Sequence, residues 1–154
     1  YAESLVTVLP PPWTFIATAE IHDEEMRRRI AEHRARRSEG WHTFEAPVDI
    51  VGALRSAPAG APVLIDCLTL WLSNLMLGDY DVAASVADLA QALGERASPV
   101  AVVSNELGLG IVPDNQLARN FRDEHGRMNQ RIAEVAGTVV FMVAGLPMTV
   151  KVTT

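Results

Sequence analysis

The sequence contains a single cysteine, Cys67, among its 154 residues. An internal disulfide is therefore excluded, and a lone thiol without partners at metal-ligand spacing does not indicate a zinc site. The commonest role for such a residue is that of a small buried apolar side chain, here next to the end of a strand. This cysteine usage is typical of a reducing compartment, and we expect a cytoplasmic protein.

The sequence also lacks an apolar stretch long enough to predict a transmembrane helix. The longest uncharged run, residues 135–150, is interrupted by Gly137, Gly145 and Pro147. No charged segment followed by an apolar one opens the chain in the manner of a signal peptide. We therefore expect neither a membrane segment nor export.

Positive charge is in short supply, since 13 basic residues face 19 acidic ones and the formal net charge is −6. A general nucleic-acid binder is expected to be basic and to interleave aromatic residues with its basic ones, so we expect no nucleic-acid partner. With 49% hydrophobic and 21% charged residues, the composition predicts one globular domain over residues 1–154 with a substantial core.

The basic residues that are present concentrate in residues 23–37. Acids open this segment and arginines close it, as the helix dipole favours, and Asp23 can cap the first turn. We predict a helix with one inward stripe. The stripe is formed by Met26, Ile30, His33 and Arg37. It places one imidazole at its polar end, among guanidinium groups.

His33 is the candidate nucleophile of this segment. A neutral imidazole offers a lone pair that can attack a phosphorus atom, and guanidinium groups are donors well suited to phosphate. The segment alone also allows the commoner structural role, that of a half-buried histidine ending an apolar stripe with solvated arginines around it. Both interpretations stay open on these residues.

Strand and helix patterns alternate along the chain. We predict strands at 13–19, 63–66, 99–103 and 138–144 with a short edge strand at 149–152, and helices at 1–9, 23–37, 47–56, 68–77, 82–93 and 114–135. The segment around Gly40 and Trp41 is predicted to be a loop. Buried strands separated by helices indicate an α/β fold, a mostly parallel sheet with helices on both faces.

Polar residues follow the predicted strands at their carboxyl ends, where open parallel sheets bind ligands. Asp66 comes directly after the apolar run 63–65, as does the Mg²⁺-binding carboxylate of phosphate-transfer folds, although many strands end in aspartate simply to start a turn. Glu106 precedes two glycines that lack the third glycine of a dinucleotide fingerprint, so we predict a flexible loop there.

Several blocks of sequence together resemble a known family. They are TFIATAE at 14–20, DEEM at 23–26 leading through Arg29 and Ile30 to His33 and Arg34, DCLTLWLSN at 66–74, SNELG at 104–108, GIVP at 110–113, and FRD at 121–123 with Gly126, Asn129 and Gln130. In this order and at this spacing, the chain resembles the bifunctional adenosylcobinamide kinase / adenosylcobinamide-phosphate guanylyltransferase family of cobalamin biosynthesis over nearly its whole length.

The resemblance implies a homotrimeric enzyme with a fold like that of P-loop NTPases. It implies phosphorylation of adenosylcobinamide and then transfer of GMP from GTP to adenosylcobinamide phosphate through a guanylyl-histidine, giving adenosylcobinamide-GDP. His33 matches the guanylylated histidine. The nucleotide-binding positions fall on Ala17, Thr18, Ala19, Arg34, Ala35, Arg36, Arg37, Glu45 and Asp66. We expect Mg²⁺ at Asp66, GTP or ATP as the nucleotide, and a role for Glu45 in accepting hydrogen bonds from guanine or ribose.

One block of the family is not among these residues. The G-x-x-x-x-G-K-[ST] loop and the strand before it would precede Tyr1. Such a loop supplies the backbone amides and the lysine that hold nucleotide phosphates, so we expect kinase activity from the parent protein and not from a chain without the loop. The alternative to the enzyme is a non-catalytic nucleotide-binding or regulatory α/β domain that has lost this loop.

Overall fold

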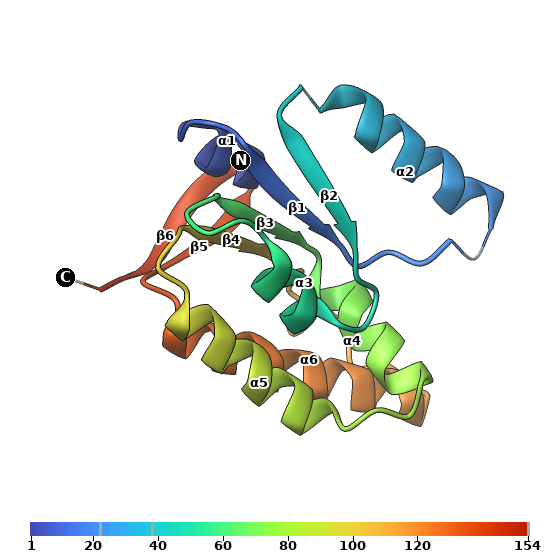
Figure 1. Ribbon diagram of the computed structural model, residues 1–154. Helices are drawn as coiled ribbons and strands as arrows, with labels where there is room; N and C mark the ends of the chain where they lie inside the picture. The colour runs from blue at the N-terminus through green and yellow to red at the C-terminus, as the bar shows by residue number, and fades with distance from the viewer. Residues whose placement is uncertain (22, 38, 154) are drawn as a thin grey trace.

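The computed structural model describes residues 1–21, 23–37 and 39–153, including their side chains except those of Arg29 and Arg36. In chain order the elements are α1 (Ala2–Thr7), β1 (Trp13–Ala17), α2 (Glu24–Arg36), β2 (Trp41–Glu45), α3 (Ile50–Ser56), β3 (Val63–Asp66), α4 (Leu68–Leu77), α5 (Val82–Glu95), β4 (Val100–Val103), α6 (Gln116–Val135), β5 (Thr138–Val143) and β6 (Leu146–Val152) (Figure 1).

Strands β1 to β4 form one parallel sheet in the order β2-β1-β3-β4. Because side chains alternate along a strand, the buried central strands serve two cores. Ile16, Val63 and Ile65 pack with α3, α4, α5 and α6 in the larger core. Phe15 and Leu64 point to the other face, where α1 covers them. The predicted mostly parallel sheet with helices on both faces is confirmed (Figure 1).

Helices α2, α3, α5 and α6 begin at a short polar side chain that caps them. Asp23 accepts a hydrogen bond from the Met26 N–H at 2.7 Å, so the predicted cap of α2 is confirmed. Asp49, Asp81 and Asn115 cap α3, α5 and α6 in the same way. Each cap satisfies an amide that the helix itself leaves unpaired. In the part of the chain that the structure describes, no helix combines the length and the apolar character needed to cross a membrane.

The segment predicted as a loop around Trp41 is instead strand β2. It pairs in parallel with β1 over its whole length, from Trp13 opposite Trp41 to Ala17 opposite Glu45. The two tryptophan rings pack against each other at a tilt of 45°, with centroids 5.5 Å apart. β2 is an edge strand with mostly exposed side chains, so it lacks the continuous apolar run that made β1 and β3 recognisable. Its β-forming residues were the signal that the prediction overlooked.

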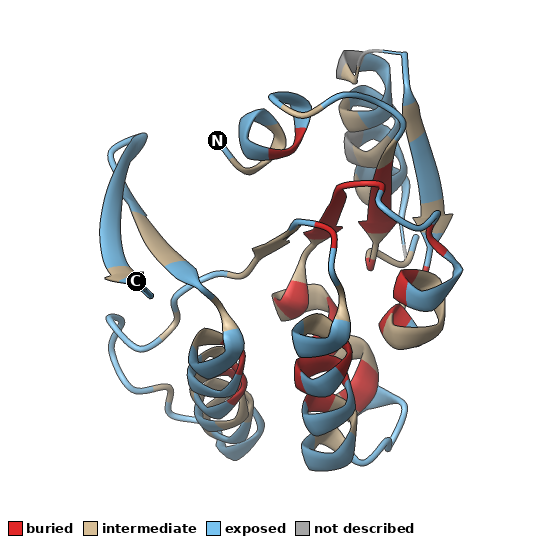
Figure 2. Cartoon of the chain, turned by 60° about the vertical axis from the view of Figure 1, so that its left-hand side comes forward, coloured by how far each residue is buried: buried red, intermediate tan, exposed pale blue. Residues whose placement is uncertain are grey.

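Strand β5, predicted to belong to the parallel sheet, instead pairs antiparallel with β6 in a separate two-stranded sheet. Ala144 and Gly145 both have positive φ, as a tight two-residue hairpin turn requires. The turn brings the next strand back immediately, without the crossover helix that parallel pairing needs. The expected final strand exists but starts earlier, at Leu146. Figure 2 shows this hairpin largely exposed beside the sheet.

Candidate active site

The carboxyl ends of three neighbouring strands bring together residues that are far apart in the sequence. Ala17 lies opposite Glu45 on one side and Asp66 on the other. Thr18 follows β1 and is fully buried. Its hydroxyl accepts from the Cys67 N–H and donates to the Cys67 carbonyl, both at 2.8 Å, and so ties the end of β1 to the end of β3. This edge is where open parallel sheets bind ligands.

Asn74 fixes the loop that leaves β1, and sequence reasoning gave it no role. From α4, its side-chain amide donates to the Thr18 carbonyl at 2.8 Å and to the Pro47 carbonyl at 2.9 Å. Ala19 is the next residue of this loop and is half-buried. A polar residue within the otherwise apolar face of α4 was the available signal, because buried amides need partners. The predicted positions 17 to 19 are therefore held rigidly at the edge of the sheet.

The predicted stripe of α2 is confirmed. Within the described side chains of this helix and its C-cap, the partly buried ones are Met26, Ile30, His33 and Arg37. The His33 ring meets the edge of the Phe15 ring, with centroids 5.7 Å apart. The Arg37 guanidinium lies 3.6 Å over the centroid of the same ring, in cation–π geometry. One aromatic side chain of β1 thus positions both the candidate nucleophile and an arginine.

Arg37 is also fixed by hydrogen bonds. Its Nη1 donates to Thr43 Oγ1 at 3.2 Å and its Nε to the His33 carbonyl at 3.5 Å. Arg34, one turn earlier, points instead toward β2, where it donates to the carboxylate of Glu45. Ala35 is exposed to solvent. The side chain of Arg36, the remaining arginine predicted to bind nucleotide, lies outside the described part of the chain.

Asp66 is the partly buried carboxylate of this edge. Burial raises the pKa of Asp66, the charges of His33 and Arg37 act against that rise, and the nearby charge of Glu3 adds to it. Burial likewise lowers the pKa of Arg37. Two basic and two acidic side chains, contributed by α1, α2 and β3, therefore lie within electrostatic reach of one another. A phosphate placed here would meet a histidine and an arginine directly.

Asp66 could hold Mg²⁺ together with nucleotide phosphates and water. Across residues 1–21, 23–37 and 39–153, no group of three or more His, Cys, Asp or Glu side chains could hold a metal ion. Mg²⁺, however, is commonly held by one or two carboxylates plus substrate phosphates and water. Asp66 provides one such carboxylate, and its raised pKa is what an adjacent cation would reverse. The residues thus fit a metal shared with a nucleotide.

A second polar cluster, centred on His125 of α6, was not predicted. His125 is 1% exposed. Its Nε2 lies 3.0 Å from Thr69 Oγ1 and 3.4 Å from Ser104 Oγ. Asn129, one turn along the helix, accepts from Ser104 Oγ at 2.7 Å and donates to the Asn105 carbonyl at 3.0 Å. The cluster fixes the segment that follows β4. The available signal was a polar pair at i and i+4 on the buried face of a helix.

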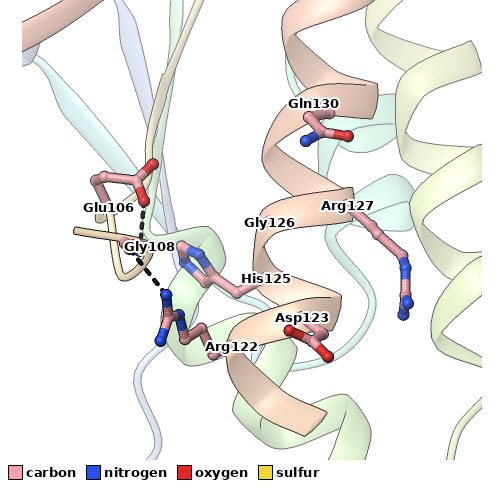
Figure 3. A pocket seen from close by; sticks show the side chains of 8 residues that line it. All are labelled: Glu106, Gly108, Arg122, Asp123, His125, Gly126, Arg127 and Gln130. Atoms are coloured by element: carbon pink, nitrogen blue, oxygen red, sulfur yellow. Dashed lines mark hydrogen bonds between the residues drawn. The ribbon is translucent and has the colours of Figure 1, made fainter. Parts of the chain in front are cut away.

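A pocket of about 420 Å³ lies beside this cluster, and Figure 3 shows the residues that line it. Glu106 accepts a hydrogen bond from the Gly108 N–H, and Arg122 donates to the Gly108 carbonyl at 2.9 Å. In the loop predicted to be flexible after Glu106, both the N–H and the carbonyl of Gly108 are therefore engaged in hydrogen bonds.

Because His125 is buried, we expect the stability of the fold to decrease at acidic pH. Burial lowers the pKa of His125 from its ordinary value of 6.5, with Glu106 acting in the opposite direction. Below about pH 6.5 the unfolded chain therefore binds a proton that the folded chain resists, and stability falls as the pH falls. We expect urea unfolding to show this loss, with a slope of at most about 1.4 kcal/mol per pH unit. His125→Gln should flatten the dependence between pH 7 and 5, and parallel curves for the two proteins would contradict the assignment.

The parallel sheet, with a histidine, an arginine and a carboxylate within electrostatic reach of one another near its carboxyl edge, defines the class as an α/β protein with a polar site at that edge. A sequence model of the cobinamide kinase / cobinamide phosphate guanyltransferase family matches residues 1–150. The chain therefore belongs to this family.

Known relatives agree with the family match. The bifunctional adenosylcobalamin biosynthesis protein CobP of Pseudomonas aeruginosa is 50% identical over 141 residues, which cover 90% of this chain and 82% of the relative. The CobU protein of Salmonella typhimurium is 35% identical over 168 aligned positions, covering 98% and 92% of the two chains. The CobU protein of Escherichia coli is 35% identical over 153, covering 89% and 84%. The predicted transferase of cobalamin biosynthesis is confirmed, and the alternative of a regulatory domain is not supported.

Proposed function

We propose that this protein phosphorylates adenosylcobinamide and then transfers GMP from GTP to adenosylcobinamide phosphate, with His33 carrying the GMP between the two substrates. The observation that supports this most directly is the position of His33. It shares the Phe15 platform with Arg37 on one face of the sheet, and both lie within electrostatic reach of Asp66 at the end of β3. We further propose a cytoplasmic homotrimer without a nucleic-acid partner, as the resemblance and the acidic composition suggest.

The transfer proceeds through two in-line displacements. A ring nitrogen of His33 attacks the α-phosphorus of GTP, and the bond to the bridging oxygen breaks as pyrophosphate leaves. A phosphate oxygen of the acceptor then attacks the same phosphorus, the P–N bond breaks, and the lone pair returns to the imidazole. Arg37, held over Phe15, would stabilise the negative charge of the phosphate oxygens, and Arg34 would join it on release from Glu45. Two easier steps replace one difficult step.

Asp66 and Glu45 are proposed to bind the metal and the nucleoside part of GTP, respectively. Asp66 would hold Mg²⁺, which when bound neutralises charge on nucleotide phosphate oxygens. Glu45 would accept hydrogen bonds from guanine or ribose. In the present arrangement Glu45 pairs with Arg34, and both side chains are largely exposed. Exposed ion pairs contribute about 1 kcal/mol or less, so a nucleotide can replace this pair at little cost.

The proposal is tested by separating the two activities in the full-length protein. Phosphoryl transfer to a hydroxyl needs no covalent histidine, so His33→Ala should still phosphorylate adenosylcobinamide while GMP transfer falls to background. His42→Ala is the matched control, because His42 lies exposed on β2, and it should retain both activities. Products are followed chromatographically with ATP and GTP supplied in turn. Equal loss of both activities in His33→Ala would show that His33 is not a dedicated GMP carrier.

A further inference from the structure

Glu3 on α1 lies close to the Nε2 nitrogen of His33. Its Oε1 is 3.4 Å from His33 Nε2. Although about half of each side chain is exposed, this carboxylate oxygen itself is buried, and it has no hydrogen-bond partner in the described structure. The contact joins two helices that are separated by strand β1 in the sequence.

Helices α1 and α2 both pack on the same apolar surface. Val6 of α1 packs with Phe15 and Leu64 in the smaller core, and His33 meets the edge of the Phe15 ring. The approach of Glu3 to His33 therefore follows from the packing of α1 and α2 on one strand.

The buried oxygen of Glu3 needs a donor, because an unpaired buried acceptor costs free energy. The basic groups within electrostatic reach are His33 and Arg37. Arg37 stacks on Phe15 and directs its Nε to a backbone carbonyl and its Nη1 to Thr43. Among the described side chains, His33 brings its Nε2 within 3.4 Å of this oxygen, so its N–H can supply the donor. Catalytic hydrogen bonds are often long before the substrate binds and shorten in the complex, which accommodates the present 3.4 Å.

We propose that Glu3 is a positioning residue for His33. Its carboxylate accepts a hydrogen bond from Nε2–H, which holds the imidazole in the tautomer whose lone pair is on Nδ1 and turns that nitrogen toward the nucleotide. The inference rests on the proposed role of His33 as the GMP carrier.

Atoms and electron pairs balance at each step of GMP transfer through His33 Nδ1. The Nδ1 lone pair forms the bond to the α-phosphorus, and the pair of the breaking P–O bond leaves with pyrophosphate. The ring, now bonded to phosphorus at Nδ1 and to a proton at Nε2, carries positive charge that faces the Glu3 carboxylate. When the acceptor phosphate attacks, the N–P pair returns to Nδ1. The Nε2 proton stays in place throughout, so no further acid, base or co-reactant is required.

The effect of Glu3 on the tautomer of His33 can be measured without any nucleotide. Long-range ¹⁵N NMR of the imidazole should show His33 protonated at Nε2 in the wild-type protein. Glu3→Gln keeps an acceptor oxygen and should keep this tautomer, whereas Glu3→Ala should give a mixture. Glu24→Ala removes a matched acid that pairs with Arg27 on the exposed side of α2 and should leave the spectrum unchanged. The same His33 spectrum in wild type and Glu3→Ala would overturn the proposal.

The chemical consequence is read from the rate of GMP attachment at saturating GTP and Mg²⁺. Glu3→Ala should slow attachment on the order of tenfold to a hundredfold, the range typical of removing a partner that orients a histidine ring. The GTP concentration for half-maximal rate should hardly change, Glu3→Gln should recover part of the rate, and Glu24→Ala should match wild type. An unchanged rate in Glu3→Ala would refute the positioning role. Absence of any adduct in wild type would instead refute the role of His33 as the GMP carrier. The NMR result would still show whether Glu3 sets the tautomer of His33.

Discussion

Full-length protein incubated with GTP and Mg²⁺ is expected to gain a single GMP, bound to His33 and released by acid. A phosphorus–nitrogen bond to imidazole is the covalent intermediate that two successive displacements require. Intact mass spectrometry before and after incubation should show one adduct per chain, and peptide mapping should place it. Addition of adenosylcobinamide phosphate should discharge the adduct, because the acceptor attacks the same phosphorus.

The other described histidines offer a poorer nucleophile. His125 is 1% exposed and its ring nitrogens lie within hydrogen-bonding distance of Thr69, Ser104 and Asn129, so its lone pair is less available for attack than that of the half-exposed His33. His42 lies exposed on β2, away from the Phe15 ring that positions His33 beside Arg37.

The control for the adduct is His33→Ala, which should carry no GMP. His42→Ala should label like wild type. An adduct that persists in His33→Ala, or one that maps to His22, His42 or His125, would contradict the assignment. His22 lies outside the described residues, so peptide mapping is the measurement that decides about it.

The sequence predicted the features of the site that depend on local pattern. Helix α2, its Asp23 cap and its stripe could be foreseen because capping and the 3.6-residue period act within a few turns. The strand ends carrying Thr18 and Asp66 could be foreseen because buried parallel strands are continuous apolar runs. Such signals require no knowledge of distant partners.

Features that depend on distant packing were not predicted. β2 is recognisable only once β1 offers it an edge to pair with. The apolar run of β5 fits a buried strand equally well, and only the turn at Ala144 and Gly145 commits it to a hairpin. The contact between Glu3 and His33 depends on both helices packing on Phe15. Local sequence patterns do not predict such contacts between segments that are distant in the sequence.

Asp66→Asn is expected to reduce Mg²⁺-dependent turnover on the order of a hundredfold or more while leaving the fold intact, since the substitution is nearly isosteric and removes one preorganised charge. Raising Mg²⁺ should recover little of the activity, because the missing ligand is the carboxylate itself. Asp88→Asn, an exposed acid on α5, is the matched control and should behave like wild type. A fully active Asp66→Asn would place the metal elsewhere, with Glu106 as the next candidate.

The same variant should be more stable than wild type at neutral pH. Burial raises the pKa of Asp66 above its ordinary 3.8, so the folded state disfavours the charged form. Both proteins should unfold similarly below that value, and wild type should lose stability relative to Asp66→Asn as the pH rises through the raised pKa. Urea unfolding at pH 3.5, 5 and 7 measures the difference. A variant that is less stable at pH 7 would mean that the Asp66 carboxylate supports the fold, and its lost activity would then say nothing about a metal. Lower activity combined with higher stability is the result expected when a charge is kept for catalysis at the expense of folding.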